Sequence, residues 1–255
     1  MRVTGSAAAV GLLVFSVGLA AVAACGGPAT QPGIGASPSA ARSPTESTGA
    51  TTTPAPSPMV TPSPSPSLSV SVVAARVTYP WSWPNDPTTP GRVTHSPPVP
   101  PVPELVRISV GNHPADSSGL PFNRIAFTFT TAFPSYRFSF TDRLISDPKG
   151  QVVPLAGLGP LTVVFTPAQA HTPDGASSTI TSQPTRPLGY RPMADYAEAG
   201  DFEGVLTYGV GITWPIPHSN PQFLVRAYEV ETVAPDGQHQ YVVAIDVDAT
   251  IRSGS

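Results

Sequence analysis

The sequence predicts an all-β protein whose folded part is an antiparallel β-sandwich. Apolar residues alternate with polar ones at a period of two over several short segments. Turn-forming Gly and Pro residues separate these segments, and no long amphipathic helical pattern is present. Many short strands divided by such turn signals are typical of an antiparallel sandwich or barrel.

The first predicted strands are rich in aromatic residues. Over residues 125–129 Ile and Phe alternate with Ala and Thr, and over residues 136–140 Tyr and Phe alternate with Arg and Ser. Large side chains at every second position predict strands with one buried face. A turn signal, Asp-Pro-Lys-Gly at 147–150, precedes two further predicted strands at 152–155 and 161–166.

The C-terminal half continues this alternation. Large apolar residues occupy every second position over 206–214, and Gly209 and Gly211 between them predict a bulge or a close backbone approach. Residues 223–233 and 240–251 flank the sequence Pro-Asp-Gly-Gln. Because Asp-Gly readily adopts the positive φ of a tight turn, these two segments predict a hairpin.

Two neighbouring segments lack a strand pattern. Residues 193–199 lie between Pro192 and Gly200 and carry a weak helical signal, so two helical turns are expected there. Residues 168–192 form the longest stretch without any pattern. Loops of that length are often functional or mobile.

Cys25, the only cysteine of the chain, directly follows an apolar run from Ala7 to Ala24. A charged start, an apolar run and small residues before a cleavage point indicate a secretory signal. The sequence Val-Ala-Ala-Cys resembles the lipobox of bacterial lipoproteins. That resemblance implies that residues 1–24 are a signal peptide and that Cys25 becomes an acylated N-terminus bearing diacylglycerol and palmitate. An ordinary secretory signal and an uncleaved membrane helix are the alternatives.

Residues 25–100 are expected to form a disordered stalk rich in Pro, Ser and Thr. The chain holds 34 prolines and 22 glycines, and as far as Ala75 this segment carries only Arg42 and Glu46 as charges. Such a composition buries too little apolar surface to offset the entropy of ordering. The folded domain is therefore expected over residues 101–255.

Three aromatic residues interrupt the predicted stalk. A disordered tether has no need of Tyr79, Trp81 and Trp83. We expect them to pack as a short segment laid across the domain surface, and a sugar-stacking or protein-binding patch is the alternative.

The charge and cysteine counts exclude several kinds of partner. The net charge is −3, from 13 Lys and Arg against 16 Asp and Glu, which argues against a nucleic-acid partner. No polybasic patch is present to bind anionic lipid, so the lipid on Cys25 is expected to hold the protein at the membrane. Acylation of Cys25 leaves no cysteine for a disulfide or a zinc site, and no cofactor or metal is expected.

Candidate catalytic residues are sparse. His113 with Asp116, and His171, belong to loop segments where solvated or capping histidines are expected rather than metal ligands. Asp246 and Asp248 share one strand face and are expected on its solvent side rather than as a catalytic pair. Since there is also no Gly-x-Ser-x-Gly motif, the protein is not expected to be an enzyme, and a hydrolase with a dispersed site is a third alternative.

A series of short motifs occurs in order between Leu105 and Asp248. The motifs are Val106-Arg107, His113-Pro114, Arg124-Ile125-Ala126-Phe127, Pro154-Leu155-x-Gly157, Leu161-x-Val163, Phe202-Glu203-Gly204, Gly209-x-Gly211 and Ile245-Asp246-Val247. Together they resemble the AMIN-like domain of actinobacterial lipoproteins and secreted proteins. This resemblance implies a sandwich related to AMIN domains, which are non-catalytic modules linked to localising envelope enzymes and to binding peptidoglycan.

The predicted function is therefore that of a membrane-anchored, extracytoplasmic lipoprotein of a Gram-positive, actinobacterial cell, with a peptidoglycan- or glycan-binding domain. Aromatic rings suit sugar faces, and arginine suits the carboxylates of wall peptides. The candidate ligand-binding residues are His113, Asp116, Arg124, Trp81 and Trp83.

Two alternatives accompany this prediction. Arg124 could instead pair with Asp116 or Asp246 at a sheet edge. The protein could also bind a protein partner by adding a strand to an exposed sheet edge, and so position an envelope enzyme or a secretion component.

Overall fold

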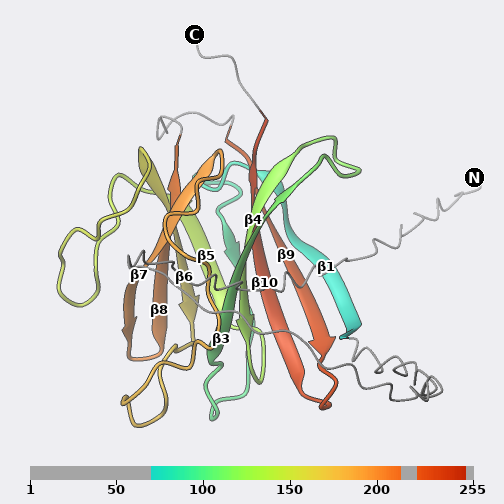
Figure 1. The fold of residues 1–255 in the computed structure, drawn as a ribbon, viewed down its shortest axis with the longest axis vertical. Coiled ribbons are helices and arrows are strands. Elements are labelled where there is room, and N and C mark those ends of the chain that lie inside the picture. Colours follow the sequence, from blue (N-terminus) through green and yellow to red (C-terminus); the bar gives the residue numbers. More distant parts are fainter. Residues whose placement is uncertain (1–69, 214–222, 251–255) are drawn as a thin grey trace, which may run out of the picture. The chain divides into compact units, whose positions relative to one another are not determined.

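A computed structural model describes residues 70–213 and 223–250 of the chain. Ten strands in these ranges form two antiparallel five-stranded sheets, which confirms the predicted sandwich (Figure 1). Sheet A has the order β1-β9-β10-β4-β3, and sheet B has the order β2-β5-β6-β8-β7. The strands are β1 (Ser71–Ser82), β2 (Arg92–Val93), β3 (Leu105–His113), β4 (Phe122–Phe129), β5 (Ser135–Phe140), β6 (Gly159–Thr166), β7 (Met193–Phe202), β8 (Val205–Ile212), β9 (Val225–Val233) and β10 (His239–Asp248). Within these ranges no helix is long and apolar enough to cross a membrane.

The core lies between the two sheets and consists largely of aromatic rings. Phe127 and Phe129 of β4 meet Phe165 of β6 at centroid distances of 4.9 and 5.0 Å, and Tyr208 of β8 lies 5.3 Å from Phe127. All four side chains are buried. The alternation that predicted strands over 125–129 and 206–214 therefore marks the inward faces of β4 and, as far as Ile212, of β8; residue 214 lies outside the described residues.

The two glycines of β8 allow a loop to pack against the strand, as the sequence predicted. A Cβ on Gly209 would lie 2.5 Å from the Leu144 side chain, and one on Gly211 would lie 2.0 Å from the Ala156 carbonyl oxygen. The loop that makes these contacts includes the expected strand at 152–155. That segment forms only an isolated bridge and joins neither sheet, so this prediction was wrong.

The sandwich begins about thirty residues before the expected boundary at residue 101. β1 pairs with β9 from Ser71 to Ser82, so this part of the predicted stalk is a strand of sheet A. Tyr79 is only 6% exposed, and its ring lies 5.1 Å from that of Phe138. It therefore belongs to the core and not, as expected, to a segment on the domain surface. The signal peptide, Cys25 and the stalk as far as residue 69 lie outside the described residues.

The segment expected to be helical is instead an edge strand of sheet B. β7 pairs with β8 along its whole length, and Met193 and Tyr196 reach the core. Ladder hydrogen bonds and burial thus outweigh the weak local helical preference of the segment. The hairpin of β9 and β10 is confirmed, with Gly237 of its turn at a φ of +83°.

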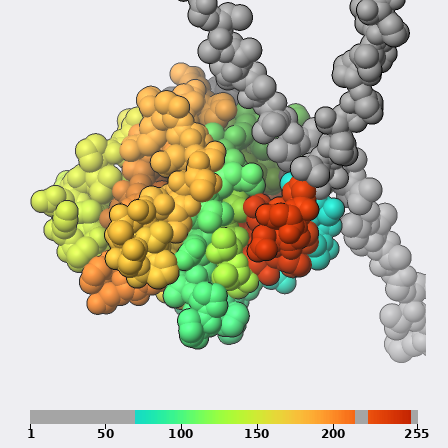
Figure 2. All heavy atoms as spheres, turned by 60° about the horizontal axis from the view of Figure 1, so that its bottom comes forward, coloured from blue at the N-terminus to red at the C-terminus, as the bar shows by residue number. Residues whose placement is uncertain are grey.

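The long segment without a pattern is partly ordered against sheet A. Residues 178–184, here called the strap, run beside the free edge of β3. The Thr181 amide donates to the Val106 carbonyl oxygen at 2.9 Å, and the Ile108 amide donates to the Ser182 carbonyl oxygen at 3.0 Å. Figure 2 shows the strap, in gold, lying against the green residues of this edge.

Candidate functional site

A buried carboxylate organises the outer face of sheet A. Asp246 of β10 lies opposite Arg124 of β4 on one side and Arg226 of β9 on the other. Arg124 donates to Asp246 from Nε at 2.6 Å and from Nη2 at 2.9 Å, and Arg226 donates from Nε at 2.9 Å and from Nη2 at 2.7 Å. The Arg226 Nη1 group also donates to Asp116 at 2.7 Å. Two guanidinium groups thus share one carboxylate.

The burial of this carboxylate corrects the expectation that Asp246 and Asp248 face solvent. Their exposed fractions are 0% and 1%. The expected pairing of Arg124 with Asp246 is confirmed, but it lies in the middle of sheet A and not at its edge. A period of two separates the faces of a strand, but it does not show what covers the outer face. Here guanidinium groups and aromatic rings cover it.

Aromatic rings enclose the two arginines. The Arg226 guanidinium carbon lies 4.6 Å from the ring centroid of Trp81 and 4.9 Å from that of Phe122. The corresponding carbon of Arg124 lies 5.2 Å from the Phe122 centroid, and His113 stacks on Phe122 with centroids 4.8 Å apart. Cations over ring faces are attracted by the ring quadrupole, most strongly when they are shielded from water. The rings and the ion pairs therefore hold each other in place.

Among the titratable groups of this site, Asp116 and His113 have lowered pKa values. Burial, the largest effect on Asp116, would raise its pKa, but hydrogen bonds from Ser118 and Arg226 outweigh it and lower the pKa. Burial lowers the pKa of His113, and the charge of Arg124 lowers it further. Asp116 is therefore ionised and His113 neutral near pH 7.

The structure brings together four of the five residues predicted to bind a ligand. We call the group the aromatic–arginine cluster; its members are Trp81, His113, Asp116, Phe122, Arg124, Arg226 and Asp246. Trp83, the fifth predicted residue, packs against the core between the sheets instead.

Arg226 was not among the residues predicted to bind a ligand, although the sequence contains a signal for it. In the hairpin, residues equidistant from Asp236 face each other. Arg226 and Asp246 each lie ten positions from Asp236, so the predicted turn already implies their pairing.

Residues 103–247 of the chain match the family model of the AMIN-like domain. The chain belongs to the AMIN-like domain family. No curated protein and no solved structure matches it. AMIN-like domains are non-catalytic binding domains of the cell envelope, so membership supports an envelope-binding role rather than catalysis.

The AMIN-like domain also has a side groove of about 500 Å³ between the strap and β7. Its lining residues are Ser178, Ile180, Gln183, Pro184, Arg186, Tyr196, Ala197, Glu198 and Tyr208. Because the strap continues sheet A and β7 is the edge of sheet B, the groove opens along one side of the sandwich.

A second buried carboxylate fixes the opposite side of the AMIN-like domain. Glu229 of β9 is 1% exposed. It accepts hydrogen bonds from Arg76 at 2.7 Å and from the Tyr136 hydroxyl at 3.0 Å, and it lies 2.7 Å from His95 Nε2. Burial, followed by the charge of Glu229, raises the pKa of Tyr136. These contacts join β1, β5 and the segment after β2, and we assign them to stability.

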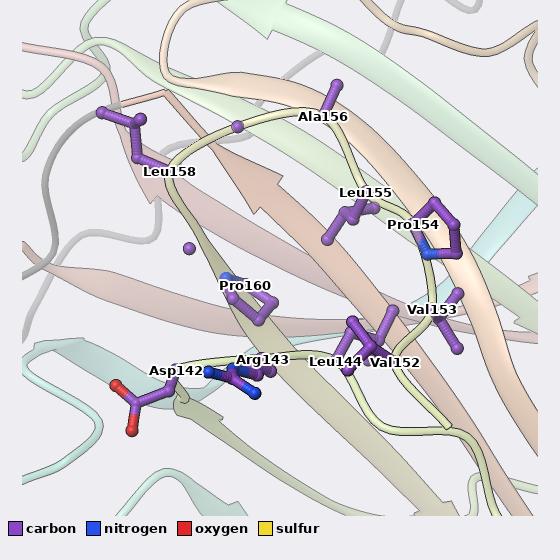
Figure 3. A pocket seen from close by; sticks show the side chains of 12 residues that line it. Asp142, Arg143, Leu144, Val152, Val153, Pro154, Leu155, Ala156, Leu158 and Pro160 are labelled. Atoms are coloured by element: carbon purple, nitrogen blue, oxygen red, sulfur yellow. The ribbon is translucent and has the colours of Figure 1, made fainter. Parts of the chain in front are cut away.

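A smaller hollow of about 280 Å³ lies beside the loop at 142–160 (Figure 3). Its lining is mostly apolar, with Asp142 and Arg143 as the charged residues. Val152 and Leu158 expose 57% and 66% of their surface. The hollow suits an apolar side chain of another molecule better than it suits acid–base chemistry.

Proposed function

We propose that the protein is an extracytoplasmic lipoprotein whose AMIN-like domain binds peptidoglycan on the outer face of sheet A. The observation that carries this proposal is the aromatic–arginine cluster, where residues from separate strands and loops converge. Trp81 and His113 are half-buried, so part of each ring is open to stack on a sugar face. Arginines beneath a ring fix its orientation, which lowers the entropy cost of binding.

The remaining predicted residues have different parts in this proposal. Arg124 and Asp116 are positioning residues, because Arg124 donates to Asp246 and Asp116 accepts from Arg226, which orients the cluster; Asp116 also accepts from the neighbouring Ser118. Trp83 has no part in the site, since it packs against the core.

Sedimentation of the purified protein with insoluble peptidoglycan tests this site. Trp81→Ala is expected to weaken binding by about tenfold, which corresponds to about 1.4 kcal/mol. Phe202→Ala is the matched control, because Phe202 is 49% exposed on sheet B, and its binding is expected to equal that of the wild type. Equal binding by all three proteins, each shown to be folded by its thermal melt, would refute the proposal.

Anchoring through Cys25 is a separate part of the proposal. It rests on the lipobox-like sequence before Cys25 and on the envelope role of the family. Cells of the source type grown with an alkyne palmitate analogue should label the wild-type protein. The Cys25→Ala variant should lose the label and leave the membrane fraction, whereas a labelled variant would contradict the assignment.

The edge strand β1 supports a second candidate function, the binding of a protein partner. β1 is the outermost strand of sheet A, and within the described ranges only β9 pairs with it in that sheet. Val72, Val73 and Val77 are 54%, 55% and 50% exposed. An exposed apolar edge accepts an added strand. Val73→Lys should abolish crosslinking to a discrete protein and leave peptidoglycan binding unchanged, and a partner that survives this substitution would exclude the edge.

A further inference from the structure

The side groove has preformed walls. The strap is held to β3 by hydrogen bonds at several points, among them the Thr179 hydroxyl, which donates to the Leu105 carbonyl oxygen at 2.8 Å. On the other wall, the Tyr196 hydroxyl donates to the Pro184 carbonyl oxygen at 2.7 Å. The volume of about 500 Å³ lies in the range of small-molecule sites, about 300–1,000 Å³.

The charged groups of the groove differ in how they are paired. Arg186 donates to both carboxylate oxygens of Asp195, each at 2.9 Å, so its charge is neutralised. Glu198 accepts a hydrogen bond from the Tyr208 hydroxyl at 3.1 Å. Among the described residues no ion pair to Glu198 is formed. Glu198 is therefore the groove carboxylate that remains available to a cation.

Neighbouring groups make the position of Glu198 costly for the ionised form. Glu198 is exposed on β7, yet partial burial of its carboxyl group, the largest effect, and the charge of Asp201 raise its pKa and outweigh the Tyr208 hydrogen bond and the charge of His171, which lower it. Asp201 itself bonds to His171 through one oxygen, while its other oxygen is buried without a hydrogen-bond partner. Glu198 therefore lies near a second carboxylate, and among the described residues it has no ion pair of its own.

We infer that the side groove binds a ligand through a primary ammonium group that pairs with Glu198. An ammonium group carries three N–H donors and no acceptor, so it can bond to Glu198 and still donate to a neighbouring oxygen. Ile180, Pro184 and the ring of Tyr196 line the groove and offer an apolar surface to the methylene chain next to the nitrogen. An anionic ligand would add a like charge next to Glu198, and a neutral one would offer no charge to pair with it.

This inference goes beyond the proposed peptidoglycan site, because the groove and the aromatic–arginine cluster share no residue. The ligand class is an aliphatic primary amine such as the side chain of lysine or of another diamino acid. Trp81→Ala should leave amine binding unchanged, so the failure of one proposal does not entail the failure of the other.

Titration calorimetry with a blocked Ala-Lys-Ala peptide tests the inference. The wild-type protein should bind this peptide at least about tenfold more tightly than the same peptide with Nε-acetyl-lysine. Glu198→Gln should weaken binding of the lysine peptide by about tenfold or more, because it removes the charge and keeps the shape. Glu203→Gln removes an equal charge from the exposed turn after β7 and should bind like the wild type.

Three results would overturn the inference. The two peptides could bind equally, the lysine peptide could fail to bind at millimolar concentration, or Glu198→Gln could bind it as tightly as the wild type. Loss of folding would not obscure the result, because Glu198→Gln removes a carboxylate that burial destabilises and should unfold no more readily than the wild type.

Discussion

Replacing Asp246 by asparagine is expected to destabilise the sandwich more than replacing an exposed residue does. Asp246 is fully buried and accepts four N–H bonds from Arg124 and Arg226, which are themselves only 13% and 11% exposed. Asparagine has nearly the same shape, but it is uncharged and places an NH₂ group where one carboxylate oxygen stood. Both guanidinium groups would then lose their shared counter-charge, and Arg226 would retain its ion pair with Asp116.

The size of the effect follows from this geometry. Removing one partner of a buried ion pair costs about 3–5 kcal/mol, because the remaining charge stays buried. Domains of this size lose about 2–4 °C in Tm for each kcal/mol, so Asp246→Asn should lower Tm by roughly 6–20 °C. Replacing Asp246, Arg124 and Arg226 together by apolar residues of similar volume should restore most of that loss, as replaced buried ion networks often do.

Urea unfolding followed by tryptophan fluorescence measures this change. The matched control is Asp236→Asn in the exposed β9–β10 turn, where asparagine can accept the same hydrogen bond from the Gln238 amide. The control should stay within about 0.5 kcal/mol of the wild type. A loss below about 1 kcal/mol for Asp246→Asn would show that the shared carboxylate contributes little to the stability of the fold.

Three further predictions concern stability. Burial raises the pKa of Glu198 above its ordinary 4.5, so the folded state binds a proton more tightly there than the unfolded chain, and Glu198→Gln should raise the free energy of unfolding at pH 7. For Asp195, burial acts to raise the pKa, but hydrogen bonds from Arg186 and two backbone amides outweigh it and lower the pKa. The stability that this carboxylate contributes should therefore be complete above its ordinary pKa of 3.8 and be lost as the pH falls below that value. In urea titrations between about pH 2 and pH 5, Asp195→Asn should show a smaller loss of stability than the wild type. Gly211→Ala should lower the free energy of unfolding by about 1–3 kcal/mol, seen as a lower Tm, because the added Cβ would lie 2.0 Å from the backbone oxygen of Ala156. Unchanged stability in any of these three variants would contradict the contact on which its prediction rests.

The strands that the sequence predicted are those whose own side chains determine their state. Alternating rings over 125–129 and 136–140 can bury only one face of a strand, and Asp236-Gly237 favours one turn. β1 and β7 were missed because their local sequence carries a weaker signal. Pro-rich neighbours surround β1, and β7 has few β-branched residues, so pairing with β9 and β8 decides both.

The candidate site was predictable only in part for the same reason. His113, Asp116, Arg124 and Trp81 stand out in the sequence as residue types, but their convergence depends on the order of strands in sheet A. The burial of Asp246 required knowing that it lies between two arginines, and only one of these, Arg226, follows from the hairpin register. The side groove depends on a contact between the strap and β3 that no local pattern encodes.

Crosslinking in living cells is the sharpest test of peptidoglycan binding by the outer face of sheet A. A photoreactive phenylalanine analogue placed at position 81 of the full-length protein reports what lies against the aromatic–arginine cluster. Peptidoglycan binding predicts a broad, high-mass adduct that collapses when the wall is digested with a muramidase. A single protein adduct that survives this digestion would contradict peptidoglycan binding at the aromatic–arginine cluster.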